Sequence, residues 1–383
     1  MGLFEKIFGT KRLPTGQGPW RTLTAYVPTF TTFNGSLYES ELVRSAIDAR
    51  ARHISKLRVE VAGTGKPRLQ TLLKQGPNGF QTWSQFLYRL STILDMQNTA
   101  FIVPVFGEYG EITGFYPVLP SMCELVRSGD EPYIRYTFQN GQQASIRVME
   151  CGIMTKFQYS QDFFGDSNLA LYNTMNLINI QNQGIEEAIK NASTYRFMAQ
   201  LGNFAKPEDL AKERKRFTSE NFASDAQGGG LLLFPSTYTN IQQIRSEAYT
   251  VDAAQQKLIQ TNVYNYFGVN EKILQNIASG DEWAAFYEGA IEPFSVQLSE
   301  VLTRVSFTIG ERSRGSEVVV TANRLQYMSN KDKLQVSAQL LDRGMISINE
   351  ARDIWNLPPV EGGDSRVIRG EYYNTEDKVD SDE

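Results

Sequence analysis

One long helical pattern, over residues 168–200, constrains the fold of this chain more than any other feature. Apolar side chains recur there alternately four and three positions apart, which is the spacing of a seam along one side of an α-helix. Such a seam is typical of the core of a single chain, and of helices that pack in a coiled coil. The seam consists of Leu171, Met175, Ile178, Asn182, Ile185, Ile189, Ala192, Arg196 and Ala199.

A second face of the same helix carries side-chain amides. Its residues are Asn173, Asn176, Asn179 and Gln183. A helix face that only meets water usually carries Lys and Glu. The amide face is therefore unusual and needs an explanation of its own.

The charge of the chain is concentrated at one end. The formal net charge is −5, from 38 basic and 43 acidic residues, and the last 13 residues alone carry six acids and one base. The body of the chain is therefore neutral, and the acidity belongs to a tail. With 383 residues, 41% hydrophobic and 21% charged, the chain has the composition of a folded soluble protein of two or three domains.

Histidine and cysteine counts exclude several kinds of chemistry. His53 is the only histidine, so one chain cannot build a zinc site from histidines or a Ser-His-Asp triad without it. We expect His53 on the polar side of a helix, solvated or capping. Cys123 and Cys151 form neither a CxxC motif nor a disulfide framework, and we expect both to be small buried residues in a reducing compartment.

Motifs for an enzyme are also missing from the sequence. It contains no GxxxxGK[ST] phosphate loop and no GxGxxG between a strand and a helix. We predict that the chain is not an enzyme, with no catalytic residues, no metal ligands and no cofactor. Its apolar runs are far shorter than the roughly 20 residues that cross a bilayer, so we expect no membrane partner and a soluble intracellular protein.

The remaining patterns predict an α+β fold. Helical spacing is found at 39–57 and 82–94, the second with Thr82 as its cap, and short β-type segments follow from 100 to 157, where Pro104 and Pro117 indicate edges or bulges. A charged segment at 203–227 has five bases and five acids, which favours a solvated helix over a nucleic-acid groove.

Helical patterns return in the last third of the chain. One runs from a Thr250 cap to Gly268, a loop follows at 269–281, and the next helix starts near Trp283 and contains Pro293, which should kink it. Two short helices follow, capped at Ser329 and at Ser347 with Glu350 and ended by Gly344 and by Leu357-Pro358-Pro359.

In order and spacing, these segments resemble the portal proteins of tailed bacteriophages. The resemblance runs from about Tyr38 to Asp364 and rests on GPNGFQTWSQF, GFYPVLPSMCELV, the long helix, YNYFGVNEKIL, the Trp283 helix with EPF, and LDRGMISINEARDIWNLPPVEGGD. Many family members have prolines before the tunnel loop, where this chain has Val269-Asn270-Glu271. The resemblance implies a portal-like α+β subunit with a mixed α/β wing, a long helical stem, a small α/β clip and a helical crown.

The family plan can be placed on this sequence by residue range. It gives an extended N-terminal arm (1–36), a wing (37–167), a stem helix (168–200), a clip (201–249), a second stem helix (250–268), a tunnel loop (269–282), a kinked long helix returning to the wing (283–328), crown helices (329–365) and an acidic tail (366–383).

The resemblance also implies an assembly and its partners. We expect a homo-oligomeric ring, typically of twelve copies, at one capsid vertex of a virion, assembled in the cytoplasm of a host bacterium. Double-stranded DNA would pass through it during packaging and ejection. The terminase large subunit and then a head-tail adaptor protein would dock on it, and the major capsid protein would surround it.

Candidate functional residues follow from this plan. The DNA channel would be lined by amides that hydrate the passage without binding DNA tightly, and the clip would offer a basic run to the motor or adaptor. Lys272 could touch phosphate transiently or could equally be a salt-bridged surface residue. The candidates for the lining are Asn173, Asn176, Asn179, Gln183, Asn270, Lys272, Gln275 and Asn276, and those for the clip are Lys212, Arg214, Lys215 and Arg216.

Two other functions remain open at this stage. One is an oligomeric virion adaptor that never contacts DNA. The other is a nuclease or packaging enzyme, which would need a nucleotide loop or a cluster of metal-binding carboxylates, and neither is visible in the sequence.

Overall fold

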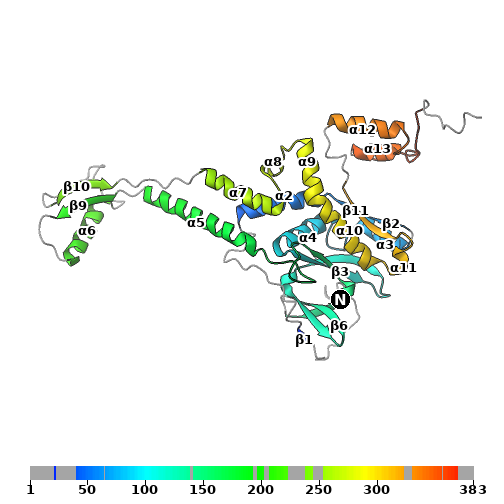
Figure 1. Cartoon of the computed structure of the whole chain (residues 1–383), viewed down its shortest axis with the longest axis horizontal. Helices are drawn as coiled ribbons and strands as arrows, with labels where there is room; N and C mark the ends of the chain where they lie inside the picture. Colours follow the sequence, from blue (N-terminus) through cyan, green and yellow to red (C-terminus); the bar gives the residue numbers. More distant parts are fainter. Residues whose placement is uncertain are drawn as a thin grey trace, which may run out of the picture. The chain divides into compact units, whose positions relative to one another are not determined.

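The computed structural model describes residues 21–22, 40–63, 65–138, 141–192, 196–201, 207–222, 238–244, 253–322, 330–355 and 357–369. These residues belong to two compact units: residues 175–257 form one, and residues 1–174 and 258–383 form the other (Figure 1). Most of the predicted arm, the predicted caps Thr250 and Ser329, and the end of the acidic tail lie outside the described residues.

Two helices of the larger unit pack together as their apolar spacing predicts. They are α2 (Glu41–Ile54) and α4 (Trp83–Gln97), and the shorter α3 (Pro67–Gln75) lies between them in sequence. The predicted apolar side of α2, from Val43 to Ile54, is fully buried. Thr82 caps α4 together with Gln85 in a capping box, so the predicted helix start is confirmed.

The strands of the larger unit form three antiparallel sheets. Their orders are β1-β5-β6-β7, β4-β3-β8 and β11-β2. Apolar residues of the four-stranded and three-stranded sheets, with Cys123 and Cys151 among them, form one buried cluster. The strands are β1 (Arg21–Thr22), β2 (Arg58–Ala62), β3 (Thr99–Phe106), β4 (Ile112–Val118), β5 (Cys123–Ser128), β6 (Glu131–Thr137), β7 (Gln143–Arg147), β8 (Gly152–Thr155) and β11 (Glu317–Thr321).

Both strand prolines lie where a missing backbone donor is tolerated. Pro117 is in β4, at the edge of its sheet, and Pro104 is in β3, the central strand. The ladder between β3 and β8 ends at Ile102, so β3 has a partner on one side only at Pro104. Pro117 therefore lies in an edge strand, and Pro104 lies where β3 is locally an edge, so the prediction is confirmed at both positions.

A continuous helical path runs from Gly280 to Ser306. It consists of α9 (Gly280–Phe286), a π turn (Tyr287–Ile291) and α10 (Glu292–Ser306). Pro293 lies directly after the π turn, at the start of α10. The sequence predicted a kink at Pro293, and the irregularity that the structure places there is the wider π turn.

His53 corrects one sequence prediction. We expected a solvated or capping residue, but His53 is only 6% exposed. Its ring packs edge-on against Trp283 of α9 at 4.4 Å between centroids, and against Phe286 at 5.7 Å. The side of α2 that looks polar in the sequence is therefore covered by α9, a helix that lies some 230 residues further along the chain.

The C-terminal region contains α12 (Asn330–Asp342) and α13 (Ile348–Ile354). Ser347 and Glu350 form the predicted capping box of α13. The tail begins later than the predicted residue 366, because Ile368 pairs with Arg343 in a β-bridge and the backbone N–H of Arg369 donates to the Asp342 carbonyl at 2.9 Å.

Between α5 (Leu169–Ala192) and α7 (Ala253–Phe267), the described residues of the smaller unit form a two-stranded sheet and a helix. The strands are β9 (Arg196–Leu201) and β10 (Tyr238–Ile244), and the helix is α6 (Pro207–Phe222). The long helix α5 (Leu169–Ala192) therefore ends before the predicted residue 200. Arg196 and Ala199 lie in a strand and not on a helical seam, because the ladder with β10 supplies backbone hydrogen bonds that local helix spacing cannot reveal.

Candidate functional site

The amide face of α5 is exposed. Asn173, Asn176, Asn179 and Gln183 are all exposed to solvent, while Leu171 and Met175 are buried. At 3.6 residues per turn the four amides occupy roughly one third of the helix circumference. No charged residue occurs between Asp166 and Glu186, so this surface is polar but neutral.

Large apolar side chains share this exposed half of α5. Ile180 is 56% exposed and Leu169 is 59% exposed, and Tyr172 and Leu177 are exposed as well. The predicted seam is therefore only partly a core, since Leu171 and Met175 are buried while Ile189 is 67% exposed. A neutral helix with exposed apolar residues is typical of a surface that another protein surface covers.

The segment predicted as a loop at 269–282 contains a short helix. This helix, α8 (Glu271–Leu274), is capped by Asn270, whose side chain accepts a hydrogen bond from the Ile273 N–H at 2.9 Å. Val269 and Ile273 anchor it in the core. Gln275 donates to Glu271 at 3.1 Å, and Asn276 adopts a left-handed backbone with φ of 58°. The structure thus gives three of the four candidate residues here, Asn270, Gln275 and Asn276, a local role in this segment.

The cation of this segment is paired. Lys272 forms an ion pair with Glu282, and the same carboxylate accepts a hydrogen bond from the Ser279 N–H at 2.8 Å. Ser279 and Glu282 form the capping box that starts α9. The hydrogen bond from Lys272, followed by that from Ser279, lowers the pKa of Glu282 to about 2. The salt-bridged alternative for Lys272 is what the structure contains, and contact with DNA stays a prediction.

The four basic candidates of the smaller unit lie on α6 and are exposed. Helical spacing places Lys212, Lys215 and Arg216 on one side and Arg214 on another. Arg216 pairs with Glu213 at 2.5 Å. Among the described residues Lys212 and Lys215 make no ion pair, so this side of α6 offers cations to a partner.

A buried polar junction holds the start of α5 and the end of α7 (Ala253–Phe267), and the sequence did not reveal it. Asn168, directly before α5, donates to the Met96 carbonyl at 2.9 Å, and its side-chain oxygen accepts from Tyr266 at 2.6 Å and from Asn98 at 2.7 Å. Asn98 ends α4 with a left-handed backbone. Two buried asparagines thus join three helix ends.

An ion cluster lies beside this junction. Asp95, fully buried, pairs with Arg50 of α2 and, at 3.0 Å, with Lys156. Arg50 also donates to the carbonyl of Ala290 in the π turn, at 3.2 and 3.3 Å. Burial lowers the pKa of Lys156, while Asp95 opposes that shift. The one available signal was a carboxylate at the apolar end of α4, in the segment ILDMQ.

Two other kinds of site are absent from the described residues. These residues contain no group of three or more His, Cys, Asp and Glu side chains placed to hold a metal ion. None of their helices combines the length and the apolar character needed to cross a membrane.

Comparison with known families identifies the class of protein. The sequence matches the family model described as phage portal protein over residues 41–356, which is most of the chain. The chain belongs to the phage portal protein family. No curated protein sequence matches it.

Solved structures show the same fold. The chain resembles a chain in the neck of an empty GTA particle with C6 symmetry, at a TM-score of 0.58 and 16% identity, over 88% of this chain and 99% of that one. A chain in the virion of a native gene transfer agent particle matches at 0.56 and 15%, over 85% and 92%. An HK97 family phage portal protein from Corynebacterium diphtheriae matches at 0.50 and 11%, over 74% and 93%.

These findings confirm the predicted family and the α+β portal fold. Phage portal proteins are structural assembly proteins of the virion and serve as head-tail connectors, so a non-enzymatic role is confirmed by family membership. The channel-lining and clip candidates are not tested by the comparisons and stay predictions.

Proposed function

We propose that this chain forms a closed homo-oligomeric ring at one vertex of a capsid and provides the channel through which double-stranded DNA is packaged and ejected. The family match over residues 41–356 carries this proposal. The similarity to necks of GTA particles with C6 and C12 symmetry supports a symmetric ring. Twelve copies of 43.3 kDa would form a particle of about 520 kDa with head-to-tail interfaces.

The exposed apolar residues of α5 support an oligomer. Leu169, Tyr172 and Ile180 are too large and too exposed for a helix that only meets water. In a ring, a neighbouring copy would cover them. The amides between them would be left to face either the neighbour or the channel.

Charge balance supports a channel that does not hold DNA. A ring multiplies every channel residue by the number of copies, so one unpaired Lys in each would form a belt of cations around a duplex that carries a phosphate charge about every 1.7 Å. Each copy instead pairs Lys272 with Glu282. The neutral face of α5 would add hydration without strong binding.

Docking of the packaging motor is the second part of the proposal. The terminase large subunit, and later the head-tail adaptor protein, would bind the smaller unit, where Lys212 and Lys215 of α6 are exposed and make no ion pair among the described residues. The major capsid protein would contact the outside of the ring. The protein would assemble in the bacterial cytoplasm and remain in the virion.

Electron microscopy of the purified full-length chain tests the ring. We expect closed particles with a central hole wide enough for a duplex. Monomers, or filaments without a hole, would contradict the proposal. A second measurement tests the channel: binding of duplex DNA to these rings should be weak at physiological salt, and tight binding abolished by changing basic residues of the clip or the loop would contradict a low-adhesion passage.

A charge-reversal experiment tests the docking surface. Lys212→Glu with Lys215→Glu should weaken capture of the terminase large subunit, while Arg312→Glu, an exposed cation on α11 (Ile309–Arg312) of the other unit, should not. Equal capture by both variants would remove α6 from the proposed surface.

A further inference from the structure

The C-terminal module, residues 330–369, is folded with almost no apolar core. Its helices α12 and α13 pack against each other. Among the side chains that the structure describes in this range, Ile354 is the only large apolar one that is buried. A folded piece of this size needs either a larger core or a partner that covers its apolar surface.

Hydrogen bonds fix the loop that follows α13. The side chain of Asn349 accepts from the Val360 N–H at 2.8 Å and donates to the Val360 carbonyl at 3.1 Å. Arg352 donates to the Pro358 carbonyl at 2.9 Å. The loop therefore has a defined conformation, and Leu357 within it is 49% exposed. Because hydrogen bonds hold this loop and a core does not, its apolar side chain stays available to a partner.

One exposed apolar patch lies where α12 turns into α13. It consists of Met345, Val367 and Ile368, and at least half of each side chain is exposed. Ile368 forms the β-bridge with Arg343, and a Cβ on Gly344 would meet the Ile368 side chain at 2.6 Å. These contacts bring residues 367 and 368 next to the turn. We call Met345, Val367 and Ile368 the turn patch.

A second exposed apolar patch lies at the opposite end of the module, where α12 begins and α13 ends. Trp355 donates its indole N–H to the Ser337 hydroxyl at 3.3 Å, and the Lys333 ammonium lies 5.4 Å from the Trp355 ring centroid. Leu334, next to Lys333, is 61% exposed, and Leu357 follows Trp355 by two residues. We call Leu334, Trp355 and Leu357 the open patch.

The two patches are different surfaces at different ends of one helix pair. Leu334 and Asp342 lie about 12 Å apart along α12, and Met345 lies beyond Asp342. A surface that binds a different surface of the next copy makes a head-to-tail contact, and such contacts close into a ring when the rotation fits. A single patch that binds itself gives a two-fold dimer instead. Two unlike patches therefore favour a ring.

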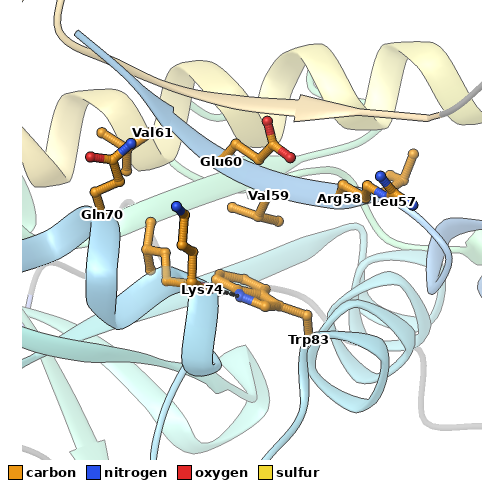
Figure 2. A pocket seen from close by; sticks show the side chains of 9 residues that line it. Leu57, Arg58, Val59, Glu60, Val61, Gln70, Lys74 and Trp83 are labelled. Carbon is orange, nitrogen blue, oxygen red and sulfur yellow. Dashed lines mark hydrogen bonds between the residues drawn. The ribbon is translucent and has the colours of Figure 1, made fainter. Parts of the chain in front are cut away.

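The attachment of this module to the rest of its own chain includes an exposed ion pair. A groove of about 490 Å³ runs along β2, between residues 57–61 on one side and α3 with Trp83 on the other (Figure 2). Arg58 of this groove forms a two-point ion pair with Asp353 in the last turn of α13, at 2.7 and 3.0 Å. Both side chains are about half exposed, and an exposed ion pair contributes little to stability. The pair leaves both apolar patches uncovered.

We propose that the open patch of one copy packs against the turn patch of the next copy, so that the C-terminal modules form a continuous belt. The inference rests on the proposed function, because it needs a ring of copies. A second copy of the chain is the partner that carries the matching apolar surface. Leu334 and Leu357 would lie against Met345 and Ile368 of the neighbouring copy, and each module would gain the apolar core that it lacks within one chain.

Cysteine pairs test this contact in rings of the full-length chain. Leu334→Cys with Met345→Cys, or Leu334→Cys with Ile368→Cys, should oxidise to disulfides between chains and give a ladder of linked chains on a denaturing gel. Within one chain these positions are too far apart, because a disulfide joins Cα atoms that are less than about 7 Å apart. If neither pair gives a ladder, the proposal is wrong.

A single new cysteine separates the head-to-tail contact from a two-fold contact. Like patches never meet in a head-to-tail belt, so Leu334→Cys alone should run as a monomer on the same gel. A linked dimer of this variant would show that two open patches face each other, and would overturn the proposed arrangement. The native Cys123 and Cys151 are buried, so they do not contribute links.

Hydrogen exchange of the rings measures how well α12 is covered. Leu334→Glu should speed exchange of the α12 amides at least tenfold, because an unpaired carboxylate is not buried against an apolar patch. Gln335→Glu is the matched control, since it adds the same charge at the next exposed position and should leave exchange as in the parent protein. Equal exchange in the two variants would contradict the contact.

The two ends of the chain are the alternative occupants of these patches. Chains that lack residues 1–20 or residues 371–383 should keep both the ladder of linked chains and the slow exchange of α12. Loss of both in either shortened chain would assign the patches to that terminal segment and overturn the contact between modules.

Electron microscopy of the same samples separates this inference from the proposed function. Closed rings whose cysteine pairs give no ladder would overturn the belt of modules and leave the proposed function in place. Samples without rings would overturn both.

Discussion

Arg50 and Asp95 form a buried ion pair that joins α2 to α4, and Arg50 extends the connection to the carbonyl of Ala290 in the π turn. Lys156 adds a second cation to the same carboxylate. Four segments, α2, α4, the π turn and the segment that carries Lys156, are therefore linked through one buried negative charge. The stability of the larger unit should depend on it.

Asp95→Asn should be strongly destabilising. It would leave two buried cations without their counter-charge, and breaking a buried pair in this way costs about 3–5 kcal/mol. Urea unfolding followed by circular dichroism measures the effect. Asp130→Asn is the matched control, because it breaks the solvent-exposed pair with Arg127 and should cost less than about 1 kcal/mol. Similar losses in the two variants would contradict the role assigned to Asp95.

His53 should make stability depend on pH. Burial, followed by the nearby charges of Lys56 and Arg52, lowers its pKa from 6.5 to about 4. The unfolded chain therefore binds a proton more readily than the folded chain between these values, and stability should fall as the pH decreases from about 6.5 to about 4. Unfolding midpoints across this range measure it. His53→Phe, which keeps an aromatic ring against Trp283, should flatten this part of the profile, and an unchanged profile would exclude His53 as the cause.

Gly165→Ala should destabilise the junction at the start of α5. A Cβ at this position would collide with the backbone carbonyl oxygens of Asn98 and Lys156, which cannot move aside easily. We expect a loss of about 1–3 kcal/mol in urea unfolding. Gly280→Ala, where an added Cβ meets nothing within 4 Å, is the control and should be neutral or slightly stabilising. Equal changes in unfolding free energy for the two variants would mean that the backbone at the junction moves to make room for the added Cβ.

Glu282→Gln should increase the affinity of the proposed ring for duplex DNA. It removes the charge that pairs with Lys272, so one cation per copy becomes available to phosphates. The slope of log K against log salt should steepen by about 0.9 for each new phosphate contact. Asp281→Asn removes the same charge one residue away and keeps the ion pair, so it should have no such effect. If both variants bind DNA with the same affinity, binding depends on the total charge of the ring and not on the ion pair between Lys272 and Glu282.

Helices whose apolar side is buried within the larger unit were predictable from the sequence. Val43, Ile47 and Phe86 follow helical spacing and lie in the core, and Thr82 and Ser347 cap their helices as their neighbours in sequence indicate. Capping and amphipathic spacing are local properties, so one chain segment contains all the information that they need.

Features that depend on distant segments were not predictable. The burial of His53 requires Trp283, the end of α5 requires β10, and the pairing of Lys272 requires Glu282. The groove along β2 arises only when α3 and Trp83 pack beside a two-stranded sheet. In each case the structure depends on a contact between two distant segments, and the periodicity within either segment does not predict that contact.

The π turn has a consequence for the helix that contains it. Phe286, Ala290, Phe294 and Leu298 are buried, although they are spaced four apart three times in succession. In a regular α-helix each step of four advances about 40° beyond a full turn, so the last residue would be displaced by about 120° around the axis. The wider π turn takes up one residue more and brings these side chains back into phase. The turn therefore works as a phase correction that lets one helix cover a single continuous core.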